Sequence, residues 1–317
     1  MIFLNQHSTK LAVTFVLTAW ICISLNDVVM KLLSNSYALH EVVLIRSIGG
    51  FFLTLFIIQY EGSWHLLKLG NKFLVFSRCL LMVTANLFYF SALVILPLAD
   101  ATALFFVAPI FISILSSILL KEIIGTRRIT AILVGLVGII IVMRPLSSVT
   151  NNIHFAIYFL PVAAAFCYAL AQVTARKLAA TTRASVMALY LHLTFILVSI
   201  VFGAIIGDGK YVNISNNPSL VFLFRPWEWP LITDWPFLIF LGALAGAIAY
   251  CVTKAYVLAE ASFVAPFEYI AVPLATLWGW LIFKHLPDFW TGLGMLVIII
   301  SGLYIYRREQ VNSKLSN

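Results

Sequence analysis

Runs of about twenty apolar residues recur along this chain and are separated by short polar links. A helix of that length is what is needed to cross the hydrocarbon core of a lipid bilayer. A β-barrel is not favoured, because its strands alternate apolar and polar residues over about ten positions. The sequence therefore predicts an all-α integral membrane protein with ten transmembrane helices. These lie at roughly 10–33, 41–58, 72–96, 101–120, 128–143, 156–177, 184–206, 235–258, 262–283 and 289–306.

The charges are few, and they lie mainly between the apolar runs. Only 10% of the residues are charged, whereas soluble proteins carry about 25%, so lipid is the expected surrounding. The net charge of +8 does not gather into one patch, and no nucleic-acid partner is expected. If the N-terminus is cytoplasmic, fourteen of the 20 Lys and Arg residues fall at or near the inner face. That bias predicts a multi-pass protein with cytoplasmic N- and C-termini.

The two halves of the chain resemble each other. Asp100 and Glu260 are 160 positions apart in similar strings, and Lys121 and Lys284 are 163 positions apart. Each half contains five apolar runs, and because five is odd, the second half must be inverted in the bilayer relative to the first. An inverted repeat around a cavity near the bilayer midplane is typical of alternating-access carriers. We therefore expect a 5+5 inverted repeat around a central cavity.

The repeat divides the chain into two predicted units, at 10–145 and 154–308, followed by a cytoplasmic tail at 309–317. The only long link, 207–234, is expected to be an external insertion in the second unit. Its aromatic and Pro-rich segment, 225–230, is interpreted as an interfacial belt, because Trp rings favour headgroup depth. A lid over the outer mouth is the alternative.

Several strings resemble the EamA-type permeases of the drug/metabolite transporter superfamily. They are PLADATAL at 97–104 with KE at 121–122, GLVG at 135–138 with MRP at 143–145, and ASFVAPFEY at 261–269 with GLY at 302–304. The resemblance covers nearly the whole chain as two tandem EamA-like units. It implies a ten-helix carrier of small metabolites in a bacterial inner membrane, and is compatible with amino acids, nucleoside-like compounds, riboflavin or S-adenosylmethionine. One departure is His285, where a second unit often has Glu.

Charged residues inside the runs are candidates for a site, because a charge at the bilayer centre costs at least about 2.5–3.5 kcal/mol. Asp27 and Lys31 are four residues apart and can pair on one helix face. With Arg46 they form either a structural ion-pair cluster or a gate at the outer mouth. Charges near the ends of runs, including Arg78, are interpreted as topology anchors whose side chains reach the interface.

Glu268 lies between Pro266 and Pro273 in one run, where the two prolines free backbone carbonyls and kink the helix. Carriers place their sites at such discontinuous helices, and we expect Glu268 to bind substrate or a proton. A structural pair with Lys254 is the alternative.

Aromatic and polar side chains at mid-depth complete the expected substrate site. A cavity for a small polar solute combines aromatic walls with a few polar groups, although aromatic residues at helical spacing also serve packing. The remaining candidates are Trp20, Asn86, Tyr89, Tyr168, Gln172, Tyr250, Tyr269 and Trp278.

The leading hypothesis is a secondary transporter of a small polar or zwitterionic metabolite. The sequence has no nucleotide-binding motif, so the energy is expected to come from a gradient of protons or of the solute itself. Its four cysteines show no CxxC spacing, and no cofactor or metal is expected. The alternatives are an integral-membrane enzyme and a non-transporting assembly subunit. The GxxxG spacing of Gly242 and Gly246 fits packing inside the bundle or a dimer face, so a monomer and a homodimer both remain open.

Overall fold

The computed structural model describes residues 6–62, 70–96, 98–122, 125–143, 156–211 and 218–282, with isolated positions between 284 and 304. Within these residues the secondary structure is helical throughout. The tail at 309–317, the boundary between the two predicted units and part of the run at 289–306 lie outside them.

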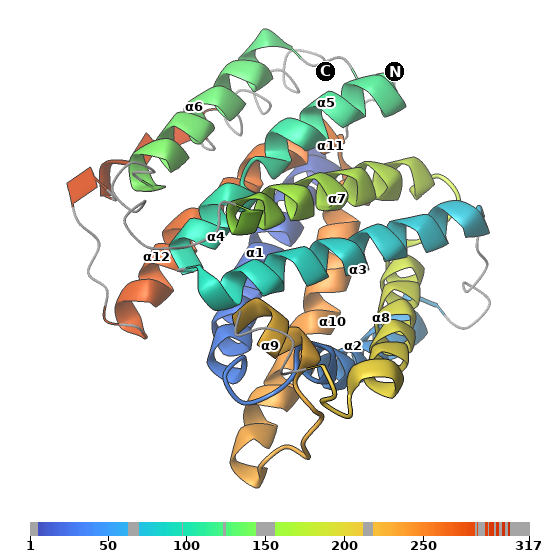
Figure 1. Cartoon of the computed structure of the whole chain (residues 1–317). Helices are drawn as coiled ribbons and strands as arrows, with labels where there is room; N and C mark the ends of the chain where they lie inside the picture. The colour runs from blue at the N-terminus through green and yellow to red at the C-terminus, as the bar shows by residue number, and fades with distance from the viewer. Residues whose placement is uncertain are drawn as a thin grey trace.

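The helices follow the apolar runs closely (Figure 1). The first half holds α1 (Gln6–Leu33), α2 (Leu39–Glu61), α3 (Lys72–Ile95), α4 (Leu98–Phe105), α5 (Ala108–Leu120) and α6 (Thr126–Met143). The second half holds α7 (Ala156–Leu178), α8 (Ala184–Ile206), α9 (Pro218–Phe224), η3 (Ile232–Asp234), α10 (Trp235–Leu258), α11 (Ala261–Val264), η4 (Ala265–Ile270) and α12 (Ala271–Leu281).

Seven helical segments in the described part of the chain are long and apolar enough to cross a membrane. They are Thr9–Leu33, Leu39–Glu61, Lys72–Ile95, Ile157–Leu178, Ala184–Ile206, Ile232–Leu258 and Ala261–Leu281. The protein is therefore a multi-pass, all-α membrane protein, as the sequence predicted.

Two of the predicted helices are broken. The prediction of one continuous helix at 101–120 is wrong, because α4 ends at Phe105 and α5 begins at Ala108. Pro109 lies in the first turn of α5, where its missing N–H leaves no bond unmade. The run at 262–283 is interrupted by the six-residue 3₁₀ segment η4, which has Pro266 in its first turn.

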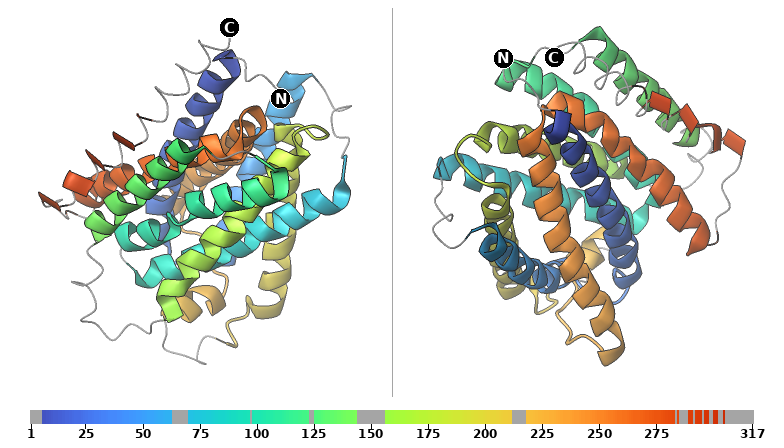
Figure 2. Two further views of the ribbon diagram at one scale, coloured as in Figure 1. Left: turned by 90° about the horizontal axis from the view of Figure 1, so that it is seen from above. Right: turned by 180° about the vertical axis from the view of Figure 1, so that it is seen from behind.

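The long helices pack in a crossed arrangement. In Figure 1, α3 and α7 run side by side across the front, and the rear view of Figure 2 shows α1 beside α10. Helix α2 packs against both α8 and α10. A Cβ atom built on Gly49 of α2 would lie 2.7 Å from the Cα of Gly242 in α10. The two backbones are therefore in direct contact, and the GxxxG face of α10 packs inside the bundle.

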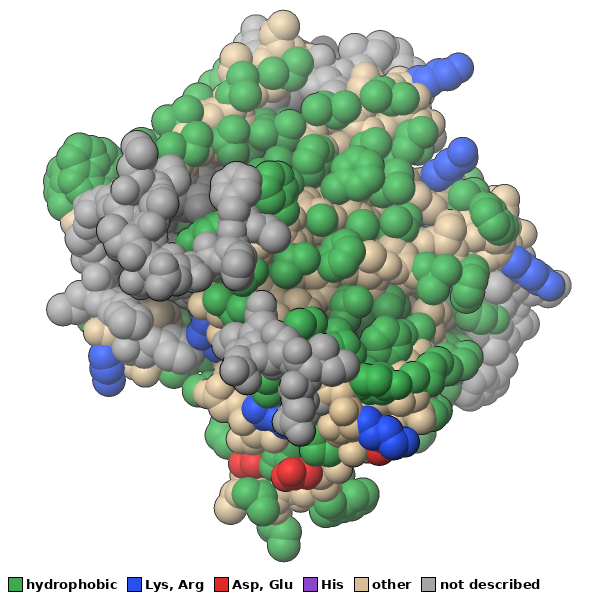
Figure 3. Space-filling model, viewed as in Figure 1, with side chains coloured by type: hydrophobic (Ala, Val, Ile, Leu, Met, Phe, Trp, Pro, Cys, Tyr) green, Lys and Arg blue, Asp and Glu red, His purple; other side chains and the backbone are tan. Residues whose placement is uncertain are grey.

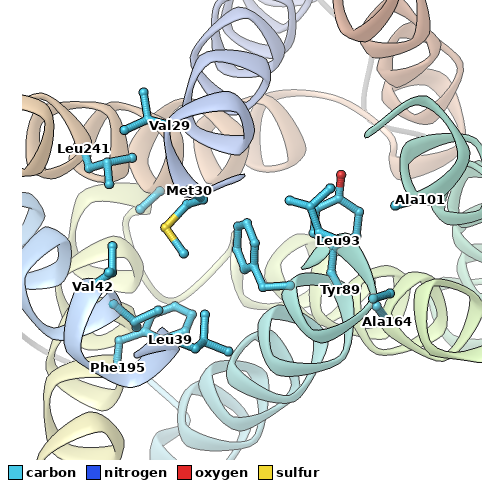
Figure 4. Packing of buried hydrophobic residues seen from close by; sticks show 14 of the residues in the cluster. Val29, Met30, Leu39, Val42, Tyr89, Leu93, Ala101, Ala164, Phe195 and Leu241 are labelled. Carbon is cyan, nitrogen blue, oxygen red and sulfur yellow. The ribbon is translucent and has the colours of Figure 1, made fainter. Parts of the chain in front are cut away.

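Apolar side chains fill the interior and also cover much of the outside. One buried cluster draws Met30 from α1, Val42 from α2, Leu93 from α3 and Phe195 from α8 into a common core (Figure 4). The face in Figure 3 is mostly hydrophobic, with charged side chains toward its edges. Phe56 of α2 is 69% exposed, as expected for a lipid-facing side chain.

Candidate functional site

A central cavity of about 160 Å³ lies where the long helices meet. Its walls come from α1, α2, α3, α4, α7, α8, α10 and α12, so both halves of the chain contribute. Seven of the predicted site residues line it: Trp20, Asp27, Arg46, Asn86, Tyr89, Tyr168 and Gln172.

A buried chain of hydrogen bonds joins α1, α2, α3 and α4 on one side of the cavity. Arg46 Nη1 donates to Asn26 Oδ1 at 2.9 Å, and Asn26 Nδ2 donates to Asp27 Oδ1 at 3.2 Å. The Tyr89 hydroxyl donates to Asp27 Oδ2 at 3.0 Å and lies 3.2 Å from the Thr102 hydroxyl. These bonds satisfy a buried carboxylate and position it close to a guanidinium, which offsets the desolvation of both.

The predicted pair of Asp27 and Lys31 does not form. Asp27 contacts Asn26 and Tyr89 instead. Lys31 Nζ donates to the backbone oxygens of Leu93 and Leu96, at 3.0 and 2.9 Å. It thus binds carbonyl groups at the C-terminal end of α3, where a cation is favoured by the helix dipole.

Arg46 is held between aromatic rings. Its guanidinium carbon lies 5.3 Å from the centre of the Phe90 ring and 5.8 Å from that of Phe195. His192 lies 146 positions after Arg46, and its ring also lines the cavity. Neither of its ring nitrogens has a hydrogen-bond partner among the described residues. Arg46 is thus a fixed part of the wall, stabilised by cation–π contacts.

Arg78 is not a topology anchor. Its side chain is 1% exposed and lines the cavity, and Nη2 donates to the Thr253 hydroxyl at 2.9 Å. Met82, Ala85 and Tyr89 follow it at intervals of four, seven and eleven residues and also line the cavity. That spacing places all four on one face of α3. The same spacing was the signal in the sequence that would have assigned Arg78 to the site.

Glu268 lies behind the cavity wall in η4. Its Oε1 accepts hydrogen bonds from the hydroxyls of Tyr168 at 2.9 Å and Tyr256 at 2.5 Å. Its Oε2 is buried and has no partner among the described residues. Tyr168 lines the cavity, so one phenol ring connects the cavity to the carboxyl group.

The alternative pair of Glu268 and Lys254 is wrong. Lys254 Nζ lies 3.4 Å from Glu61 Oε1 instead. Tyr250 donates to the same oxygen at 2.6 Å, and Ser185 donates to Glu61 Oε2 at 2.5 Å. This Glu61 cluster joins α2, α8 and α10. Tyr250 and Lys254 belong to it and do not line the cavity.

Two further candidates also lie outside the cavity lining. Trp278 reaches the site indirectly, because its Nε1 donates to the hydroxyl of Ser24, which lines the cavity, at 3.0 Å. The Tyr269 hydroxyl donates to the backbone oxygen of Ile132 at 3.3 Å, and its ring packs against Phe106. Tyr269 therefore holds η4 against α6.

The described residues of the external link pack on the ends of helices. Trp227 stacks on His40, with ring centres 5.5 Å apart. The Tyr37 hydroxyl donates to Asp234 Oδ2 at 2.6 Å. Burial raises the pKa of Tyr37, and the bond to Asp234 raises it further, which keeps this phenol protonated. No described residue of 207–234 lines the cavity, so the lid stays a prediction.

No group of three His, Cys, Asp or Glu side chains in the described residues is placed to hold a metal ion. The side chains that line the cavity offer charge, hydrogen-bonding groups and aromatic rings.

Comparison with known proteins finds a family, several relatives and a solved structure that are similar to this chain. Residues 10–144 match the EamA-like transporter family. A riboflavin transporter of Vibrio cholerae is 29% identical over 255 residues, covering 80% of this chain and 74% of the relative. An S-adenosylmethionine uptake transporter of Rickettsia bellii is 26% identical over 292 residues, covering 92% of each. The chain is thus similar to EamA-type transporters over these residues, and to these two transporters over most of its length.

The fold of this chain is also found among solved structures. A crystal structure with 18% sequence identity superposes with a TM-score of 0.74 and covers 93% of this chain and 96% of the other. The names of the family and of the relatives indicate transport and point away from an enzyme.

Proposed function

We propose that this protein is a secondary transporter that carries a small polar or zwitterionic metabolite through the central cavity by alternating access. The observation that carries the proposal is the cavity itself, which has Asp27, Arg46 and Arg78 in its wall. All three side chains are at most 8% exposed. A charge inside a membrane protein is expensive, and such charges usually mark the path of a substrate or an ion.

The proposed architecture is the ten-helix inverted repeat. Helices α1, α2 and α3 would correspond to α7, α8 and α10, and the broken α4–α5 segment to α11–η4–α12. The packing supports this, because exchanging the halves turns the α3–α7 contact into the α10–α1 contact. Residues at equivalent positions also meet at the cavity: Asn26 and Gln172 are 146 positions apart, and Tyr89 and Thr253 are 164 apart.

Two further equivalences support the repeat. Among the described non-glycine residues, only Lys121 and Lys284 have positive φ, of 56° and 60°. They are the pair that the sequence aligned. A bond similar to that of Lys31 to the Leu93 oxygen occurs in the second half, where Arg176 of α7 donates to the Val257 oxygen of α10 at 2.7 Å. Val257 is equivalent to Leu93 at the 164-residue offset, whereas Arg176 lies one position before the equivalent of Lys31.

The relatives suggest which metabolites to test first. One is named for riboflavin and the other for S-adenosylmethionine uptake. The rings of Trp20, Phe105 and Tyr168 line the cavity, and a flat heterocycle would stack on such walls. We propose the bacterial inner membrane as the location, with both termini in the cytoplasm.

Counterflow in proteoliposomes tests this function. Vesicles loaded with unlabelled S-adenosylmethionine or riboflavin are diluted into the labelled compound, and an imposed proton gradient is the second variable. We expect saturable accumulation above that of protein-free vesicles, with the label recovered chemically unchanged. If neither compound nor a panel of amino acids and nucleosides accumulates, the transporter proposal fails, and recovery of a converted product would favour the enzyme alternative.

A further inference from the structure

Arg78 has more hydrogen-bond donors than its surroundings satisfy. A guanidinium group carries five N–H donors. Nη2 donates to Thr253, whereas Nε and Nη1 are buried and have no partner among the described residues. Buried donors are rarely left unpaired in native proteins, and each such group calls for an explanation.

The charge of Arg78 is also unmatched, in contrast to that of Arg46. Arg46 reaches the carboxylate of Asp27 through Asn26. Arg78 makes no ion pair with any carboxylate in the part of the chain that the structure describes, and its polar contact is the neutral hydroxyl of Thr253. The nearby Tyr168 hydroxyl is already committed to Glu268. An uncompensated buried charge is strongly unfavourable, so a ligand that neutralises it would be bound tightly.

The neighbouring groups indicate what else the ligand carries. Phe105 lies 5.3 Å from the ring of Tyr168 and 6.5 Å from that of Trp20, measured between ring centres, and these rings form an aromatic wall. Gln172 Oε1 is a buried acceptor without a partner among the described residues, and it lines the same cavity. It would accept a hydrogen bond from an amino or ring N–H group.

We propose that Arg78 binds the anionic group, a carboxylate or a phosphate, of the transported metabolite, and that this metabolite carries a flat or aromatic part beside it. The inference rests on the proposed transport function and narrows its substrate class. The planar guanidinium can present a fork of two N–H groups, one from Nη1 or Nε and the other the second N–H of Nη2, to the two oxygens of a carboxylate or phosphate. The ligand would complete the hydrogen bonding of Arg78 and leave the Arg46–Asp27 network intact.

Matched pairs of probes test the assignment in detergent-purified full-length protein by thermal shift. Each pair differs in one anionic group: S-adenosylmethionine and its decarboxylated form, tryptophan and tryptamine, and riboflavin 5′-phosphate and riboflavin. The first two pairs report a carboxylate and the third a phosphate. Specific ligands raise the melting temperature by mass action, so titration yields an apparent Kd for each probe.

In the wild-type protein we expect the acidic member of at least one pair to bind about 10- to 100-fold more tightly than its partner, as for loss of a hydrogen bond to a charged group. Arg78→Gln should abolish that preference, and Arg78→Lys should retain part of it because the charge remains. Lys72→Gln, which removes an exposed charge from the same helix, should leave it unchanged.

Three results would overturn the assignment. The first is an equal effect of both members of every pair, the second is a preference that survives in Arg78→Gln, and the third is the absence of any shift with the acidic probes. Size-exclusion chromatography confirms that each variant is folded. Counterflow distinguishes failure of the Arg78 assignment from failure of the transporter proposal. Transport without a preference for the anionic member of a pair rules out only the role of Arg78. If no probe is transported, the transporter proposal fails as well.

Discussion

At the scale of single residues, Glu268 is the most unusual buried group. Two tyrosine hydroxyls share one of its oxygens, the other has no partner in the described residues, and the side chain is fully buried. Oε1 can accept both bonds whether or not the carboxyl carries a proton. A proton could therefore bind to Oε2 and leave without breaking either hydrogen bond. This suits a carboxyl group that alternates between its protonated and its ionised form.

Glu268→Gln should remove the binding and release of a proton, while it keeps the shape of the side chain and one hydrogen-bond acceptor. We expect uptake into proteoliposomes to fall at least about tenfold and to lose its response to an imposed proton gradient, because an amide cannot release the proton. Glu228→Gln, in the exposed external link, is the matched control and should transport normally. A Glu268→Gln protein with the wild-type rate and an unchanged gradient response would contradict this role.

How far residue roles can be predicted from the sequence depends on which partner a side chain meets. Asp27, Arg46 and Tyr89 could be nominated because a polar group in an apolar run stands out. Asn26 and Thr102, which complete their network, did not stand out, because small polar groups are common in membrane helices. The partners of Lys254 and Glu268 lie on other helices, and the helix rotations that decide such contacts cannot be read from spacing alone.

At the scale of helices, α2 and α10 pack with their backbones in close contact at two glycines. Gly49 and Gly242 face each other so closely that neither position has room for a methyl group on the present backbone. Dispersion contacts between two backbones replace the hydrophobic driving force, which is weak inside lipid.

The long helices were predictable from the length of the apolar runs. The breaks at α4–α5 and η4 were less so, because a proline can either kink a helix or end it.

Gly49→Ala should destabilise the protein. The added Cβ would meet backbone atoms, which can yield only by moving a helix, and such overpacking costs about 1–3 kcal/mol. Alanine gains up to about 1 kcal/mol of helix propensity over glycine, so the net effect is a lower melting temperature in detergent. Gly279→Ala is the control, since a Cβ there meets nothing within 4 Å, and its melting temperature should be equal or higher. The reverse order of the two variants would show that the helices do not cross as described.

At the scale of the whole molecule, the number of spans determines where the ends of the chain lie. An even number returns the C-terminus to the side of the N-terminus, whereas an odd number separates the two. With ten spans and a cytoplasmic N-terminus, a C-terminal alkaline phosphatase fusion should be inactive and a C-terminal fluorescent protein should fluoresce. An active phosphatase would exclude the combination of ten spans and a cytoplasmic N-terminus.

At this scale the sequence predicted an all-α, multi-pass membrane protein correctly. The duplication stays a proposal, with one backbone observation in its support. The aligned pair of Lys121 and Lys284 shares the same rare backbone conformation. The composition of the cavity was less predictable, because it depends on which faces of eight helical segments turn inward. Arg78 is an example. Its position near the end of an apolar run suggested that it reaches the membrane interface, but it lies on the face of α3 that lines the cavity.

Alternating access requires one cavity that faces each side of the membrane in turn. Ala85 lines that cavity and is 5% exposed, so a cysteine there reports access without disturbing the charged groups. After replacement of the four native cysteines, Ala85→Cys is treated with a membrane-impermeant maleimide in right-side-out and inside-out vesicles. Phe52→Cys, at a 65% exposed position expected to face lipid, is the control and should react from neither side. We predict that Ala85→Cys reacts from both sides, whereas labelling from one side only, or from neither, would contradict alternating access.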